Sequence, residues 1–175
     1  IFQQDMKGVL AYSTISHLGL ITLLLGLNST LALVAAIFHM INHATFKASL
    51  FMAAGMVDHE TGTRDLGRLS GLYKAMPITA TLATVAAASM AGVPLLNGFL
   101  SKEMFFAETT FVSGDDLIQI GLPLLATVAG AFSVAYSLRF ILQVFFGPPA
   151  TDLPRAPHEP PRWMLFPSAL LVFMC

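Results

Sequence analysis

Two histidines and a lysine recur at every fourth position inside a long apolar segment. His39, His43 and Lys47 stand at positions i, i+4 and i+8, and at about 100° per residue this spacing places all three on one narrow face of a helix. Removal from water disfavours the charged form of a lysine, and histidine titrates near neutrality, so both side-chain types can exchange protons at physiological pH. The pattern therefore predicts proton exchange along one face of a helix.

This histidine–lysine row cannot pass protons by direct contact. The rise between members is about 6 Å, roughly twice the length of a hydrogen bond, so water or neighbouring side chains have to bridge the steps. The alternative is that the histidines only hydrogen-bond across helices and that Lys47 extends its ammonium group to the membrane surface. Lys47 lies far from both ends of its segment, and an ionisable group at such depth costs at least about 2.5–3.5 kcal/mol if it faces lipid. We therefore expect the row to face protein or water.

A second ionisable group follows a predicted helix break. Gly92 and Pro94 interrupt another apolar segment, since proline lacks a backbone donor and glycine tolerates non-helical angles. Unwound backbone at membrane depth is typical of ion sites in transporters. Lys102 is expected in the first turn of the half-helix that resumes after the break, where the helix dipole disfavours a cation. Glu103 is either a second working group or an ordinary first-turn acid.

Weaker signals concern four further polar residues. Lys7 follows Asp5 at the entrance of the first helix, and it is either an interfacial lysine or a working group of a vestibule that the two residues share. His17 lies in mid-helix and either extends the polar row or serves as a hydrogen-bonded structural histidine. Tyr136 and Gln143 are interpreted as packing residues.

The composition indicates the environment in which these residues work. The chain is 55% hydrophobic and 11% charged, against roughly 45–50% and about 25% in soluble domains, and its apolar residues come in long blocks, as bilayer segments require. The formal net charge of −1 offers no basic field for nucleic acid, and a single cysteine excludes an intrachain disulfide. We expect an all-α, polytopic bundle of transmembrane helices with one broken helix.

The apolar blocks predict how the chain is divided. A transmembrane part over 1–147 is followed by a Pro-rich loop at 148–161 and by the start of a truncated helix at 162–175, and a short interfacial helix is predicted over 66–74. The chain begins without Met and stops inside an apolar run, so we interpret it as a fragment of a longer membrane protein. The expected spans within the transmembrane part are 6–27, 30–57, 77–112 with the break inside it, and 117–146.

The distribution of charge predicts an orientation. If the third block crosses the membrane once, the lysines and arginines outside the spans collect on one side, and the other side receives acids such as Asp115 and Asp116. This asymmetry follows the positive-inside rule. We therefore expect the start of the chain and the loops 58–76 and 148–161 to be cytoplasmic. The basic residues concerned are Lys7, Arg64, Arg68, Lys74, Arg155 and Arg162.

Several motifs in the same order resemble one family. The chain is similar to the antiporter-like subunits shared by respiratory complex I and the Mrp cation/proton antiporters, and the loop at 57–66 resembles the A subunit of the Mrp type. The resemblance extends to about residue 147 and is weak beyond it. The motifs are Asp5-x-Lys7-x-x-Leu10-Ala11-Tyr12-Ser13-Thr14-x-Ser16, His39-x-x-x-His43-x-x-x-Lys47, Gly98-Phe99-x-Ser101-Lys102-Glu103 and, in the loop, Val57-Asp58-His59-Glu60-Thr61-Gly62-Thr63-Arg64-Asp65-Leu66.

The resemblance implies a fold and residue roles. The family is built from two inverted five-helix repeats, each with one broken helix, and residues 1–147 resemble the last four helices of the second repeat. Lys47 resembles a buried proton-relay lysine with His39 and His43 alongside. Lys102 resembles the lysine of the broken helix that hands protons to one side, and Lys7 resembles a residue near the cytoplasmic entrance.

The implied function is that of a transporter subunit rather than an enzyme. It is a proton-translocating half-channel of a multi-subunit Na⁺(K⁺)/H⁺ antiporter in the cell membrane, and its partners are other subunits of a hetero-oligomer, lipid, H⁺ and Na⁺ or K⁺. The alternative is a proton-pumping subunit of complex I or of a membrane-bound hydrogenase. The first repeat is absent from the chain, so this piece alone is not expected to transport.

Histidine ligation offers an alternative of another class. His17, His39 or His43 could serve as axial ligands of a haem, and His39 with His43 could form part of a helical zinc site. The residues between these two histidines include no acid and no third ligand is evident. We expect neither a cofactor nor a metal.

Overall fold

The computed structural model describes residues 2–112 and 116–175, except for the side chain of Asp116. Its regular elements are helices, which confirms the all-α prediction, and Asp115 lies outside the described residues. The elements are α1 (Met6–Gly26), α2 (Thr30–Thr61), a 3₁₀ turn η1 (Leu72–Lys74), α3 (Pro77–Ala91), α4 (Asn97–Thr110), α5 (Asp116–Phe145) and α6 (Arg162–Phe173).

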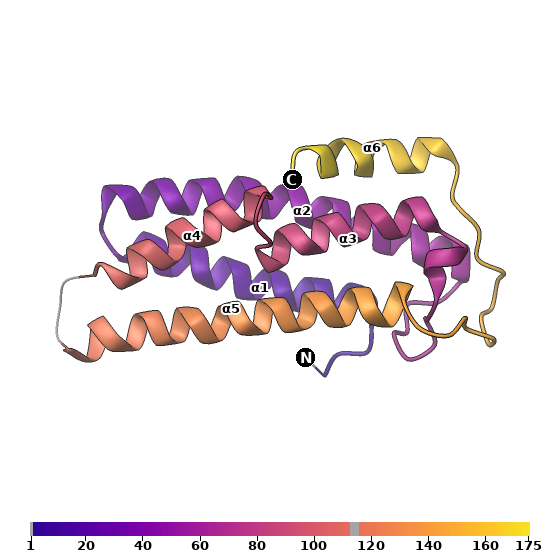
Figure 1. Ribbon diagram of the computed structural model, residues 1–175, viewed down its shortest axis with the longest axis horizontal. Coiled ribbons are helices and arrows are strands. Elements are labelled where there is room, and N and C mark those ends of the chain that lie inside the picture. Colours follow the sequence, from indigo (N-terminus) through magenta and orange to yellow (C-terminus); the bar gives the residue numbers. More distant parts are fainter. Residues whose placement is uncertain (1, 113–115) are drawn as a thin grey trace.

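The helices form one elongated bundle (Figure 1). α1, α2 and α5 are long and apolar enough to cross a membrane, whereas α3 and α6 are shorter apolar helices. α3 and α4 follow one another along the bundle (Figure 1), so together they have the length of one crossing. The start of α1, the end of α2, the start of α3 and the loop 148–161 meet at one end, which we call the charged end.

Side-chain caps explain where the first two helices begin. The Asp5 carboxylate accepts a 2.7 Å hydrogen bond from the backbone N–H of Gly8, and the Ser29 hydroxyl caps α2 as expected for that residue type. α2 continues to Thr61, past the predicted end of its span at 57, because the first residue that stops it is Gly62 in the left-handed conformation (φ 74°).

The helix break is short. Gly92 ends α3 with φ 85° and its N–H bonds to the carbonyls of Ala88 and Ser89, and Leu96 is extended before α4 begins at Asn97. Gly98 is required here because a Cβ at this position would overlap the Ser89 backbone carbonyl.

The position of the break corrects one prediction. Because α4 already begins at Asn97, Lys102 and Glu103 lie in its second turn, so the expectation that they occupy the first turn was wrong. The dipole effect falls off within the first turn, and it therefore contributes less at Lys102 than the sequence indicated.

The predicted interfacial helix over 66–74 was also wrong, since only η1 is helical there. Two local features compete with a longer helix. The Asp65 carboxylate accepts from the N–H of Gly67 at 2.9 Å, which is a turn that diverts the backbone, and Gly71 adopts a left-handed φ of 64°.

The core between α2 and α3 consists largely of small side chains. Ala53 and Ala54 of α2 and Ala80, Ala83 and Ala87 of α3 are buried. Small residues let helix backbones approach closely, which is how helices associate in lipid. This close approach brings the middle of α2 against the break and positions the polar residues described next.

Candidate functional site

Buried polar side chains from four helices meet at the centre of the bundle. His39, His43 and Lys47 lie on one face of α2 and are 2%, 8% and 5% exposed, so the row faces protein. Within the described part of the chain no hydrogen bond joins its members directly, and the ring centroids of His39 and His43 are 6.3 Å apart. The remaining buried polar residues of this centre are Ser13 and His17 of α1, Ser101 and Lys102 of α4, and Ser133 and Tyr136 of α5.

His17 joins the row from the neighbouring helix. Its ring centroid is 5.2 Å from that of His39 and 5.2 Å from that of His43, and its Nδ1 lies 3.0 Å from His39 Nε2. The side chain is fully buried. The bridging group that the helical rise required is therefore a side chain of α1, placed between two members of the row.

Tyr136 continues the contact chain into α5. Its hydroxyl lies 2.9 Å from His17 Nε2 and donates to Ser133 Oγ at 3.2 Å. Tyr136 belongs to the buried core, as the packing interpretation predicted, and its hydroxyl also makes polar contacts that this interpretation did not include. Gln143 is exposed and accepts a 3.0 Å hydrogen bond from Arg139, so the packing interpretation was wrong for it.

Lys102 stands at the other end of the same chain. Its ammonium group donates to Ser133 Oγ and to the Ala91 carbonyl, both at 2.9 Å. A Cβ on Gly92 would approach Lys102 Cδ to 2.8 Å, so the glycine at the break also makes room for the lysine. The resulting hydrogen-bonded chain, which we call the central chain, runs Lys102–Ser133–Tyr136–His17–His39–Ser101.

Lys47 lies outside the central chain. It donates to the Leu10 carbonyl at 3.1 Å and to the Ser13 hydroxyl. Among the described residues, neither Lys47 nor Lys102 pairs with a carboxylate. Both amines are held by neutral oxygen atoms, so no neighbouring anion fixes their charge.

His43 lies between Lys47 and the central chain along α2, and no hydrogen bond of the described residues connects Lys47 to that chain through it. Its Nε2 is buried and makes no hydrogen bond within the described part of the molecule. The ring stacks on His17 and meets Phe46 edge-on at 5.5 Å. Buried polar atoms are nearly always hydrogen-bonded. The unpaired Nε2 therefore leaves the His43 ring free to form a new hydrogen bond if the ring turns or a neighbouring group moves.

Two grooves reach these residues from the surface. One, of about 740 Å³, lies between α1 and α5 and is lined by residues that include both Ser13 and Tyr136. The other, of about 680 Å³, lies between α4 and α5 and is lined by Lys102, Glu103 and Thr110 among others. Glu103 is exposed on this groove and does not belong to the central chain.

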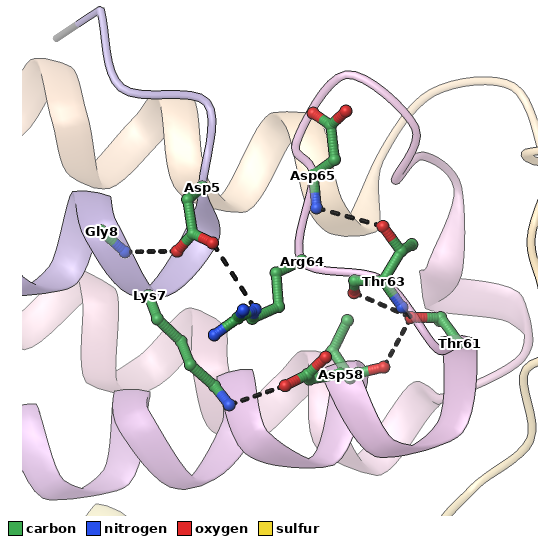
Figure 2. A network of polar contacts seen from close by, with 9 residues as sticks. Asp5, Lys7, Gly8, Asp58, Thr61, Thr63, Arg64 and Asp65 are labelled. Carbon is green, nitrogen blue, oxygen red and sulfur yellow. Dashed lines mark hydrogen bonds and ion pairs between the residues drawn. The ribbon is translucent and has the colours of Figure 1, made fainter.

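Lys7 lies at the charged end, beside Asp58 (Figure 2). Its ammonium group is 2.7 Å from the Asp58 carboxylate, and both side chains are about one-third exposed. Asp5 pairs instead with Arg64 at 3.6 Å, so Asp5 and Lys7 occupy neighbouring ion pairs. Lys7 precedes Leu10, whose carbonyl holds Lys47, by three residues.

Sequence reasoning missed Ser13, Ser133 and Tyr136 as partners of the ionisable residues. Ser133 and Tyr136 are three apart in a transmembrane segment and share a helix face, which is a signal that could have linked them. Within the described ranges, no three His, Cys, Asp or Glu side chains are grouped as metal ligands.

Comparison with known proteins places this geometry in a family. Residues 1–129 match the family described as "NADH:quinone oxidoreductase/Mrp antiporter, TM". The chain is 69% identical over its full length to a probable K⁺/H⁺ antiporter A/B subunit of Rhizobium meliloti (strain 1021), of which it covers 18%. It is 45% identical over 97% of its length to the Na⁺/H⁺ antiporter A subunit of Bacillus subtilis (strain 168), of which it covers 23%.

A solved structure gives the same result. The Mrp complex from Dietzia sp. DQ12-45-1b contains a chain that is 43% identical in sequence and superimposes with a TM-score of 0.85. The match covers 98% of the present chain and 18% of the chain in that complex. The chain thus spans about a fifth of the length of these relatives, and the sequence-based resemblance is confirmed. The expectation that the resemblance weakens beyond residue 147 was wrong, because the matches extend over 97–100% of the chain. The chain belongs to the transmembrane family shared by the NADH:quinone oxidoreductases and the Mrp antiporters.

Proposed function

We propose that this chain forms a proton-translocating half-channel within the A subunit of a multi-subunit Na⁺(K⁺)/H⁺ antiporter of the cell membrane. The observation that carries the proposal is the central chain, in which Lys102 and His39 are linked through Ser133, Tyr136 and His17 by contacts of 2.9–3.2 Å. Hydroxyl and imidazole groups can both donate and accept hydrogen bonds. In the structure, the Ser133 hydroxyl accepts from Lys102 and Tyr136 and donates to the Met90 carbonyl at 3.2 Å. In this proposal, proton transfer through Ser133 therefore requires its hydroxyl to turn from Met90 toward Tyr136.

The proposed path has two segments that no direct hydrogen bond of the described residues connects. Lys47 and Ser13 form one segment and the central chain forms the other. The groove between α1 and α5 is lined by Ser13 and Tyr136, and water in this groove joins the two segments. His43, whose Nε2 has no described partner, offers a second bridge when its ring or a water molecule moves.

The ends of the path follow from the flanking features. Lys102 passes protons into the groove between α4 and α5, where Glu103 is exposed. Lys7 acts near the entrance at the charged end, which faces the cytoplasm in the orientation that the positive-inside rule favours. In this proposal residues 1–147 are the last four helices of the second repeat, 148–161 is a cytoplasmic loop, and 162–175 begins the next helix.

Relatives named as cation/proton antiporter subunits favour the antiporter over the alternative. The family also includes subunits of NADH:quinone oxidoreductases, which leaves a proton-pumping subunit of complex I or a membrane-bound hydrogenase as the second candidate. Genes for quinone-reducing or hydrogenase subunits beside this one would favour that candidate. Genes for further antiporter subunits favour the proposal.

The test uses two serines of α5 in the full-length protein. Ser133→Ala removes the hydroxyl that links Lys102 to Tyr136. Ser137→Ala removes a hydroxyl that, among the residues the structure describes, bonds only to the carbonyl of Ser133 in its own helix. We expect cation/proton exchange in everted membrane vesicles to fall about tenfold in the first variant and to stay at the wild-type rate in the second. Equal rates in both variants contradict the proposed path.

A further inference from the structure

Asn42 is a buried amide of α2 that the central chain does not include. It directly precedes His43, is 6% exposed, and its side-chain amide donates to the backbone carbonyl of Asn97 at 3.1 Å. An amide removed from water costs free energy unless it is hydrogen-bonded, and a backbone carbonyl has two lone pairs with which to accept. The bond therefore joins the middle of α2 to the first residue of α4, which lies beside it (Figure 1).

A second contact joins the same two helices one turn further along α4. His39 Nδ1 lies 3.0 Å from the hydroxyl of Ser101, which is fully buried. His39 and Asn42 are three residues apart on α2, and Asn97 and Ser101 are four apart on α4, so each pair shares one face of its helix. One contact fixes a point on α4, whereas two contacts one turn apart also fix its rotation about its own axis.

The rotation of α4 decides where Lys102 points. Adjacent residues of a helix are about 100° apart around its axis, so with Ser101 held toward α2 the next side chain points to a different neighbour. Lys102 donates there to the Ser133 hydroxyl of α5 and to the Ala91 carbonyl, both at 2.9 Å. A turn or slide of α4 against α2 therefore displaces both ends of the central chain, because Lys102 and Ser101 are those ends.

The other attachments of the start of α4 reach different helices. The N–H of Gly98 donates to the Ser89 hydroxyl of α3 at 3.3 Å, and the Asn97 side chain donates to the Met174 carbonyl at the end of α6 at 2.6 Å. Among the described residues, neither α3 nor α6 contributes a side chain to the central chain. Asn42 instead ties this start to α2, the helix that carries the histidine–lysine row.

We propose that Asn42 is a positioning residue of the half-channel. It holds the start of α4 in the rotation and axial position that point Lys102 at Ser133 and Ser101 at His39. Asn42 transfers no proton itself, because a side-chain amide does not titrate. Its effect on ion exchange rests on the proposed function, whereas its hold on α4 does not.

The first test measures how firmly α4 is held in the full-length protein, purified within its complex. Asn42→Leu keeps a branched side chain and removes the donor, and amide hydrogen exchange is followed at Leu100, Ser101 and Lys102. We expect these amides to exchange about five- to tenfold faster than in the wild type, the size of losing one buried hydrogen bond. Unchanged hydrogen exchange at these three residues overturns the proposal.

Thr45→Val is the matched control for the loss of a polar group from α2. Thr45 lies three residues further along the helix, and its hydroxyl donates, among the described residues, to the carbonyl of Ile41 in the same helix at 2.9 Å. This variant should leave the amides of α4 at their wild-type rates. Asn42→Ala removes the amide without adding bulk and should loosen α4 as Asn42→Leu does. Equal loosening of α4 by Thr45→Val overturns the proposal.

A double-variant cycle in everted vesicles separates positioning from general destabilisation. Asn42→Leu should lower the maximal rate of cation/proton exchange per assembled complex about tenfold and leave the cation concentration for half-maximal rate unchanged. Ser133→Ala removes the hydroxyl toward which Lys102 is held. If Asn42 acts through that contact, the double variant also loses about tenfold, whereas independent effects multiply to about a hundredfold. A hundredfold loss overturns the positioning role.

The two measurements distinguish this proposal from the proposed function. Ion exchange at the wild-type rate in Ser133→Ala contradicts the proposed path, and hydrogen exchange in α4 still decides whether Asn42 holds that helix. Wild-type hydrogen exchange in both Asn42 variants overturns the positioning role and leaves the half-channel function to its own test.

Discussion

The lysines at the centre of the bundle and the lysine at its charged end have opposite kinds of partner. Lys47 and Lys102 donate to backbone carbonyls and serine hydroxyls. Lys7 forms a 2.7 Å ion pair with Asp58, and Arg64 pairs with Asp5 beside it. The buried cations thus lack counter-ions among the described residues, whereas the partly exposed ones have them.

This difference indicates which residues can exchange protons. A carboxylate beside an ammonium group favours the charged form and keeps the proton in place. Neutral carbonyl and hydroxyl oxygens favour the charged form less strongly than a carboxylate does, and burial adds a cost for charge. The centre is therefore suited to transfer and the charged end to holding helices together. The following predictions test this contrast.

The largest effect is expected at the two central lysines. Lys47→Ala and Lys102→Ala in the full-length protein should reduce cation/proton exchange to background, a loss on the order of 100-fold, because each removes a positioned proton-transfer group. The measurement is the collapse of a pH gradient on cation addition to everted vesicles. Lys74→Ala, at η1, is the control and should exchange at the wild-type rate. Wild-type exchange in either central variant would contradict the proposed difference between the central lysines and the lysine at the charged end.

The next effect concerns the fit of the helix break. Gly98→Ala places a Cβ against the Ser89 backbone, which cannot move away without shifting α3. We expect a destabilisation of about 1–3 kcal/mol, as for overpacked cores, seen as a lower melting temperature of the purified protein and as reduced exchange.

Gly55→Ala is the matched control for this substitution, since a Cβ there meets nothing within 4 Å. It should melt at the wild-type temperature or slightly above it, because alanine favours helix over glycine. If both variants melt alike, the close contact at the break does not constrain the fold.

A smaller effect is expected at Tyr136. Tyr136→Phe keeps the ring and removes the hydroxyl that lies between His17 and Ser133. Exchange should fall about tenfold, equivalent to roughly 1.4 kcal/mol, the scale of one buried hydrogen bond. Tyr73→Phe should leave the rate unchanged, because the Tyr73 ring stacks on Phe146, just past the C-terminal end of α5, outside the central chain. Unaltered exchange in Tyr136→Phe would mean that protons bypass the central chain.

The smallest effect is expected at the charged end. Lys7→Ala and Asp58→Asn should each reduce exchange no more than about threefold, because partly exposed ion pairs contribute about 0–1 kcal/mol. The loss should shrink further at high salt, which screens exposed charges. The exchanged pair Lys7→Asp with Asp58→Lys should recover most of the rate. Complete loss in Lys7→Ala would place Lys7 in the relay and remove the distinction between the two regions.

Sequence patterns predicted the helices and the ionisable residues well where the signal was local. Apolar block length predicted the long helices, and the spacing of His39, His43 and Lys47 predicted a shared, buried face. Predictions were wrong where a nearby contact overrode the pattern. The Asp65 turn and Gly71 prevented a helix over 66–74, and α4 began earlier than the glycines and proline of the break indicated.

The sequence by itself determined that a buried row of proton-exchanging residues exists on one helix and that a second lysine follows a helix break. Both conclusions rest on helical periodicity and on the cost of charge in lipid, which act within a segment. Only the tertiary structure decided what connects them. His17 comes from α1, Tyr136 and Ser133 come from α5, and hydrogen bonds between helices depend on packing distances of a few tenths of an ångström that no spacing within one segment encodes.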